Sequence, residues 1–253
     1  PDAMGLGLGF VEHEGPVFSR PIRDAKAIEQ LPSVDPEAEL FYVLDAIRLI
    51  KADLDKKTPL IGFAGSPWTV ATYMVEGGAS KHFKRIKRLI YAETKQAHQL
   101  LQKLALNSSQ YLLAKKVAGI DVFMLFDTWG GVLSASDFLH FSLHYMKIVV
   151  ADIKARYPHV PVIVFTKNGG KHLEALADTG ADALGLDGGA NLALARQTVG
   201  GRVALQGNLE PAALYAAPAQ ITQLVEKTLA EFGAGSGHVF NLGHGIYPDT
   251  NPE

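Results

Sequence analysis

Short apolar runs alternate along this chain with longer segments whose apolar residues recur at helical spacing, a pattern that few folds accommodate. The apolar runs, which we interpret as strands, cover residues 59–63, 121–126, 161–165, 183–186, 203–206 and 238–242. The helical segments cover residues 35–54, 81–91, 94–117, 136–157, 171–178, 192–199 and 218–232. Asp35 would cap the first of these helices, with Pro36 at its first position, and residues 65–73 would form the loop after the first strand. Strands that alternate with helices in this way predict an α/β fold with a parallel sheet.

The residues that follow the predicted strands favour a barrel over an open doubly wound sheet. No strand leads into a well-formed dinucleotide-binding fingerprint, and Gly, Asp, Thr, Asn or His follows all of the strands rather than one switch point. We therefore expect a (β/α)8 TIM-barrel-like fold that is incomplete here, with about six of its eight strands. Residues 1–253 would form this single partial domain, and residues 5–31, which lack clear periodicity, would hold a hairpin or an irregular excursion.

Composition and charge exclude several classes of function. The net charge of -2 does not indicate a nucleic-acid partner, and no apolar run reaches the roughly 18 residues that a membrane span needs. The absence of cysteine excludes disulfides and cysteine-ligated metals. His140 and His144 have the spacing of a helical metal pair, but no acidic residue accompanies them, so we expect exposed histidines and no metal site.

Four strings carry a more specific signal than any single motif. Residues 62–78 read GFAGSPWTVATYMVEGG, residues 126–131 read FDTWGG, residues 206–211 read QGNLEP, and residues 241–246 read NLGHGI. In order and approximate spacing these strings resemble the uroporphyrinogen decarboxylases, and the likeness covers nearly the whole chain.

The resemblance implies a barrel enzyme of haem biosynthesis that removes CO2 from the four acetate side chains of uroporphyrinogen III and yields coproporphyrinogen III. It implies no metal or organic cofactor, a cytoplasmic location, and a homodimer when the protein is full-length. Such an enzyme must hold the ring, supply a proton and stabilise a transient positive charge. It must also bind a flexible polyanion.

The resemblance also assigns roles to four residues. Tyr73 would be catalytic, positioning the reacting acetate, and Thr128 would contact a substrate carboxylate. Phe126 would press on the tetrapyrrole, and His244, between two glycines, would contact substrate. The residues alone leave other readings open: a structural tyrosine, a helix cap, a core phenylalanine and a solvent-exposed histidine.

Three charged residues near the predicted strand ends have less definite roles. We expect Asp127 and Asp187 to cap or orient neighbouring groups, because a polyanionic substrate repels additional carboxylates. Lys167 would either meet a propionate at the rim or lie on the surface. Residues 188–191 read GGAN where the family usually has Trp-Thr-Thr-Asp, which puts the contacts of this loop in doubt.

The resemblance further implies segments that this chain does not contain. We expect the family's catalytic aspartate and its substrate-gripping arginine string to fall before Pro1, and the chain to stop short of the family's C-terminus. A fragment of that kind would be inactive. Two alternatives stay open: a corrinoid-dependent methyltransferase of the same superfamily, which usually uses zinc and cysteine, and a non-catalytic homologue that binds a tetrapyrrole.

Overall fold

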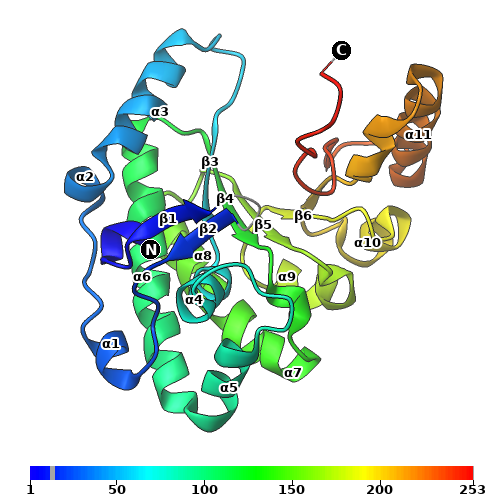
Figure 1. Ribbon diagram of the computed structural model, residues 1–253. Helices are drawn as coiled ribbons and strands as arrows, with labels where there is room; N and C mark the ends of the chain where they lie inside the picture. The colour runs from blue at the N-terminus through cyan, green and yellow to red at the C-terminus, as the bar shows by residue number, and fades with distance from the viewer. Residues whose placement is uncertain (12–14, 253) are drawn as a thin grey trace.

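A computed structural model describes residues 1–11 and 15–252, and it contains one parallel sheet of six strands (Figure 1). The strands are paired in sequence order, from β3 to β8. They are β3 (Ile61–Gly65), β4 (Val122–Asp127), β5 (Val162–Thr166), β6 (Ala183–Gly185), β7 (Ala204–Gln206) and β8 (His238–Val239). The predicted α/β fold with six parallel strands is thereby confirmed, and within the described residues β3 and β8 remain outer strands, as in an incomplete barrel.

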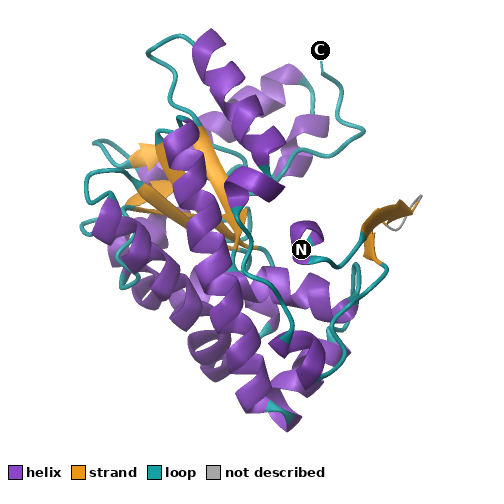
Figure 2. Ribbon diagram, turned by 90° about the vertical axis from the view of Figure 1, so that its left-hand side faces the viewer, coloured by secondary structure: helices purple, strands orange, loops and turns teal. Residues whose placement is uncertain are grey.

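Helices connect consecutive strands, as parallel pairing requires (Figure 2). The longest crossover, from β3 to β4, contains α4 (Pro67–Glu76), α5 (Lys84–Ala92) and α6 (Thr94–Ala118). The later crossovers contain α8 (His144–Arg156), α9 (Leu173–Ala177), α10 (Leu192–Val199) and α11 (Pro218–Phe232). The predicted helices over residues 192–199 and 218–232 agree with α10 and α11 at both ends.

The two faces of the sheet are both apolar but have different neighbours. Alternate strand residues such as Phe123 and Leu205 join the main core, which the helices complete. The residues between them point to the other, inner face, where Met124, Ile163 and Phe165 form a second, smaller cluster. The inner face of this sheet is therefore available to line a cavity.

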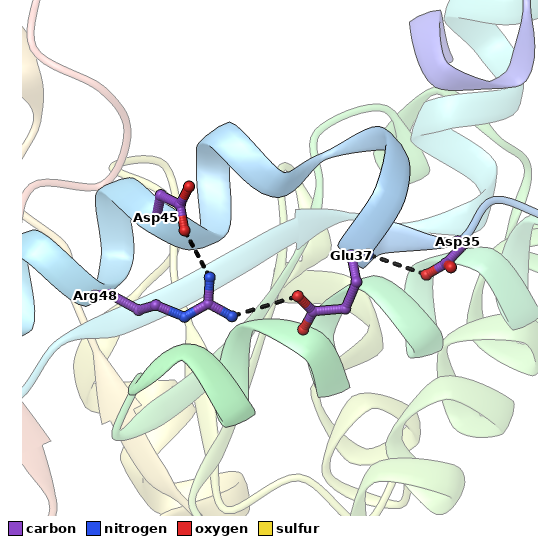
Figure 3. A network of polar contacts seen from close by, with 4 residues as sticks. All are labelled: Asp35, Glu37, Asp45 and Arg48. Atoms are coloured by element: carbon purple, nitrogen blue, oxygen red, sulfur yellow. Dashed lines mark hydrogen bonds and ion pairs between the residues drawn. The ribbon is translucent and has the colours of Figure 1, made fainter.

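The predicted helix over residues 35–54 is wrong as a single element. The structure has α2 (Pro36–Glu39) and α3 (Phe41–Asp53), separated at Leu40, whose backbone leaves the helical conformation with φ -127° and ψ 21°. The predicted cap at Asp35 is present and accepts the Glu37 N–H at 3.1 Å. Arg48 joins the two helices by bonding Glu37 on α2 and Asp45 on α3 (Figure 3).

Two further segments differ from the sequence interpretation. Residues 65–73, which we took for a loop, enter α4 at Pro67, because Ser66 caps the helix by accepting the Thr69 N–H at 3.0 Å. The predicted helix over residues 136–157 begins as α7 (Ala135–Asp137) and widens into a π-helical turn over Phe138–Leu143 before α8. Such turns are frequent near functional sites.

The N-terminal segment contains the expected hairpin. Strands β1 (Leu8–Val11) and β2 (Gly15–Phe18) pair antiparallel, apart from the six-stranded sheet (Figure 2). Residues 12–14 and residue 253 lie outside the described residues. Short helices flank the hairpin, a 3-10 turn at Asp2–Met4 and α1 at Ala25–Glu29. Among the described residues, no helix has both the length and the hydropathy that crossing a bilayer demands.

Candidate active site

A cavity of about 880 Å³ lies on the inner face of the sheet, and we call it the sheet cavity. Its apolar wall includes Ile61, Phe63, Met124, Phe126, Phe165, Leu186, Leu242 and Ile246. Its polar residues are Thr69, Thr128, Gln206, Asn241 and His244. A hollow of about 970 Å³ lies elsewhere, against α6 and α8, but it contains none of the predicted site residues. The sheet cavity is the better candidate, since active sites of barrels lie at the carboxyl ends of the strands.

Phe126 belongs to a row of rings along the cavity wall. Its ring centroid lies 5.6 Å from that of Phe63 and 5.4 Å from that of Phe165. The Phe165 ring in turn lies 6.2 Å from the His244 ring. The row gives the cavity an extended aromatic surface that ends at an imidazole, which suits the flat, apolar face of a ligand.

Thr128 lines the cavity, whereas the carboxylate of the preceding Asp127 points away from it, because side chains alternate along a strand. Asp127 is fully buried, and burial raises the pKa of its carboxyl, although hydrogen bonds to the carboxylate oppose the shift. It accepts bonds from Ser66 (2.6 Å), Ser142 (2.7 Å), Thr69 (3.2 Å) and Thr166 (3.4 Å). As expected from the sequence, this aspartate orients its surroundings rather than facing a ligand.

The backbone that presents Thr128 is held in place from α4. The Trp129 N–H donates to Thr69 Oγ1 at 3.2 Å, and Trp68 Nε1 donates to the Trp129 carbonyl at 3.0 Å. Since Thr69 Oγ1 also donates to Asp127, one hydroxyl connects the buried carboxylate to the cavity loop. Thr128 is therefore on a braced turn, which favours a fixed position for its side chain.

Tyr73 lies on α4 and is not among the residues that line the sheet cavity. Its half-buried ring contacts the Trp129 ring edge-on, with centroids 6.3 Å apart. The structure thus brings Phe126, Thr128 and His244 to one cavity and leaves Tyr73 outside its lining, in contact with Trp129. The roles of all these residues stay predictions.

His244 occupies the cavity rim in a defined tautomer. Its Nδ1 accepts the Gly245 N–H at 2.8 Å, so in the neutral ring Nε2 carries the hydrogen and can donate to a ligand. Partial burial and the nearby Lys167 lower the pKa of His244, and Asp187 and Glu210 partly oppose them. A neutral imidazole with an available N–H donor is well suited to a carboxylate.

The loop that departs from the family pattern packs directly beneath His244. A Cβ on Gly243 would overlap the Gly188 backbone nitrogen and lie 2.7 Å from the Asp187 carbonyl carbon. Asp187 accepts the N–H of Gly189 at 2.8 Å and that of Asn168, which fits the orienting role expected from the sequence. The lack of a side chain on Gly243 thus allows the two loops to approach closely.

Sequence reasoning missed two amide side chains at the carboxyl end of strand β7. Asn208 Nδ2 donates to the carbonyls of Asp187 and Ala190, at 2.8 Å each, and ties down the departing loop. Gln206, the last residue of β7, lines the sheet cavity. Their positions at the end of a strand are the signal that could have marked them. Within the described residues, no group of three or more His, Asp or Glu side chains is placed to hold a metal ion.

The family model and the curated relatives agree on one family. A family model described as uroporphyrinogen decarboxylase matches residues 1–253. The uroporphyrinogen decarboxylase of Alkalilimnicola ehrlichii is 55% identical over 255 residues, which cover 100% of this chain and 70% of that protein. The one from Histophilus somni is 57% identical over 252 residues, covering 99% and 71%. A methyltransferase from Methanosarcina mazei has the same fold, with a TM-score of 0.83 at 21% identity, over 99% of this chain and 72% of that structure.

Proposed function

The chain belongs to the uroporphyrinogen decarboxylase family, and from this premise we propose that it removes CO2 from the acetate side chains of uroporphyrinogen III in the sheet cavity. The observation that carries the proposal is the composition of that cavity. An aromatic and apolar wall fits the face of a macrocycle, while the hydroxyl of Thr128 and the imidazole of His244 lie where carboxylates would project.

The reaction needs an electron sink, which the substrate itself supplies. Protonation of the pyrrole carbon beside the acetate gives a cationic ring. The bond between the CH2 group and the carboxylate then breaks, CO2 leaves, and the bonding electrons enter the ring. A proton added to the CH2 carbon and another lost from the ring carbon complete the methyl group. The rings of Phe126 and Phe165 can lie against the transient cation, whose charge their π faces attract.

The polar rim holds the side chains of the substrate. We assign to the Thr128 hydroxyl and to His244 Nε2 the role of hydrogen-bond donors to substrate carboxylates. Lys167, which is close enough to His244 to lower its pKa, adds a positive charge on the same side. Rim donors of this kind fix which acetate faces the reacting position, and this orientation is worth more to the rate than binding alone.

We assign Tyr73 an indirect role, because it does not line the sheet cavity. Because its ring contacts Trp129 rather than the cavity, it is a positioning residue that steadies the turn carrying Thr128. Tyr73→Phe, which keeps the ring, should then retain most of kcat, whereas Tyr73→Ala should lower it. If the phenol instead donates to the acetate, Tyr73→Phe should lose as much activity as Tyr73→Ala.

We also propose the oligomeric state and the cellular location of the chain from those of the family. We expect a homodimer, because the family is generally dimeric, and a cytoplasmic location, because the absence of cysteine suits a reducing compartment. Light scattering coupled to size-exclusion chromatography measures the first. A monomeric mass at micromolar concentration would contradict it.

The decisive experiment is anaerobic incubation of uroporphyrinogen III with a version of the chain that carries a family N-terminal segment, beside the chain alone, followed by oxidation and chromatography of the porphyrins. We expect coproporphyrinogen III with partly decarboxylated intermediates from the version with that segment, and the chain alone tests whether the segment is needed. Thr128→Val and His244→Asn should each lower kcat/KM by about tenfold or more, as loss of a hydrogen bond to a charged group predicts. The matched surface variants Thr198→Val and His159→Asn should leave it unchanged.

The outcomes separate the alternatives. Binding of uroporphyrinogen without CO2 release would favour a non-catalytic tetrapyrrole-binding protein. A protein that neither binds nor turns over uroporphyrinogen would contradict the proposal. Turnover that Thr128→Val and His244→Asn both leave unchanged would also contradict it.

A further inference from the structure

Basic side chains are concentrated on and just before α5. The chain has no acidic residue between Glu76 and Glu93, and the basic residues of this stretch, which we call the α5 cluster, are Lys81, Lys84, Arg85, Lys87 and Arg88. Lys87 is half-buried and the other members are exposed, whereas Ile86 and Ile90 of the same helix are buried. The cluster therefore presents its charges to solvent.

These charges are unfavourable for the helix that carries them. Lys84 and Arg85 stand in its first turn, where the helix dipole favours acidic residues, and that turn contains none. Lys84 and Arg88 are four residues apart, so they lie on one face of the helix and repel each other. Within the described residues, no member of the cluster forms an ion pair. Side chains that weaken their own helix indicate a use outside it.

The nearest part of the chain does not neutralise the cluster. Glu76 turns its carboxylate to the start of α5, where Oε1 accepts the N–H of Arg85 at 2.9 Å and that of Ile86 at 3.0 Å. Arg23 adds a further positive charge beside the helix. Burial lowers the pKa of Arg23 and Arg85 lowers it further, although Glu76 opposes them. The potential around α5 thus stays positive.

The start of α5 adjoins the turn that carries Thr128. The ring of Phe83, the residue before α5, lies 5.0 Å from the ring of Trp129, measured between centroids. Trp129 directly follows Thr128, which lines the sheet cavity. Lys81 and Trp129 also line a common hollow of about 490 Å³. The cluster therefore begins close to the rim of the sheet cavity.

The other end of α5 is fixed to the segment that follows β4. Tyr91 donates a 2.6 Å hydrogen bond from its phenol to Asp137 Oδ2 on α7. Figure 1 shows α5 and α7 at the same end of the molecule. Because contacts at both ends hold the helix, its charges keep their position relative to the cavity.

We propose that the α5 cluster is a capture surface for the polyanionic substrate, which attracts the carboxylates of uroporphyrinogen III and raises its rate of association with the sheet cavity. This inference rests on the proposed function and adds the surface by which the substrate arrives. The cluster acts through its field and touches no reacting atom, because charges near a cleft raise the local concentration of an oppositely charged ligand.

The same field sorts substrate from product. Uroporphyrinogen III carries four acetates and four propionates, whereas coproporphyrinogen III keeps only the propionates. Each decarboxylation removes a negative charge, so attraction to the cluster weakens as the reaction proceeds. The cluster thus favours entry of the substrate over return of the product.

Stopped-flow quenching of the two tryptophans under nitrogen measures association and dissociation rates of both porphyrinogens with the two forms of the chain used for turnover. In the wild type, uroporphyrinogen III should associate faster, and salt should slow it more. Combining Lys81→Gln, Lys84→Gln and Arg88→Gln should lower its association rate by about tenfold or more at low salt. The difference should vanish at about 1 M salt, where charges are screened beyond roughly 3 Å.

The matched control removes the same net charge elsewhere. It combines Lys56→Gln and Lys57→Gln, in the loop before β3, with Lys227→Gln on α11, and all these lysines are exposed. Its association rates should equal those of the wild type. Both combined variants should keep the wild-type dissociation rates and thermal midpoint, since steering acts on association and surface substitutions change stability little.

The outcomes distinguish this inference from the proposed function. Equal slowing by both variants would assign the effect to net charge and overturn the capture surface. Faster dissociation that persists at high salt would overturn steering in favour of a direct contact, and unchanged rates would overturn the inference altogether. If neither form of the wild-type chain binds a porphyrinogen, the proposed function fails as well.

Discussion

Ser142 Oγ donates a 2.7 Å hydrogen bond to Asp127 Oδ2, which joins the π-helical turn after β4 to the end of that strand. The extra residue per turn of a π-helix changes which side chain faces the strand. Here the turn brings a serine to a fully buried carboxylate that lies immediately before Thr128. The chain thus supports one wall of the cavity from the opposite side of the sheet.

We expect Asp127→Ala to lower the free energy of unfolding by roughly 2–4 kcal/mol, because its hydroxyl partners lose a buried acceptor together. Asp127→Asn should cost less, since its amide oxygen still accepts and no charge is buried. Urea denaturation measures both. The exposed Asp178→Ala, which removes a surface ion pair with Arg202, should change stability by no more than about 1 kcal/mol. Equal effects of Asp127→Ala and Asp178→Ala would contradict the bracing role.

A second prediction concerns a lysine that is buried without an acid. Lys115 donates to the Phe63 carbonyl at 2.7 Å and lies over the Tyr111 ring, and burial lowers its pKa to about 8 from 10.5. Because the pKa of Lys115 is lower in the folded state than in the unfolded state, folding favours the neutral amine over the protonated one. The resulting penalty is complete below pH 8 and disappears as the pH rises toward 10.5.

Lys115→Met should therefore raise the free energy of unfolding at pH 7 by roughly 1–3 kcal/mol, after allowance for the lost bond to Phe63. The gain should shrink as the pH approaches 10, where wild-type Lys115 folds without its proton. Denaturation at several pH values measures the difference, with the exposed Lys95→Met as control. A gain that does not depend on pH would mean that the cause is packing rather than charge.

The sequence predicted the repeating elements well because their signals are local. The spacing of apolar residues located α10 and α11 fully, and the Asp35 cap was recognised from the proline that follows it. Phe126, Thr128 and His244 came from the family resemblance, and the structure brings them to one cavity because the carboxyl ends of parallel strands meet at one face.

What the sequence could not predict depends on contacts between distant segments. The break at Leu40 and the π-helical turn have no local marker, and their registers follow from packing. Whether Tyr73 faces the cavity depends on the direction of α4 relative to Trp129. That the Oε1 of Gln206 is buried without a hydrogen-bond partner among the described residues is likewise a property of the folded chain.

The ionisation of His244 gives a third prediction. Burial lowers its pKa, and Lys167 lowers it further, so Lys167→Met should raise the pKa of His244. Lys171 has the same effect on His172, which provides a matched control: Lys171→Met should raise the pKa of His172 and leave that of His244 unchanged. Titration of the imidazole signals by NMR reports both. A His244 pKa that responds equally to the two variants would place Lys167 away from the rim.

The two glycines beside His244 give the last prediction, because they differ in what surrounds them. A Cβ on Gly243 would overlap the backbone at Gly188, whereas a Cβ on Gly245 would meet nothing within 4 Å. Gly243→Ala must therefore push apart the two loops and displace His244, and it should weaken porphyrinogen binding by about tenfold or more. Gly245→Ala keeps the N–H that His244 Nδ1 accepts and should bind like the wild type. Anaerobic titration of the two variants with coproporphyrinogen III makes the comparison. If both alanines bind alike, the contact between Gly243 and Gly188 does not control the position of His244.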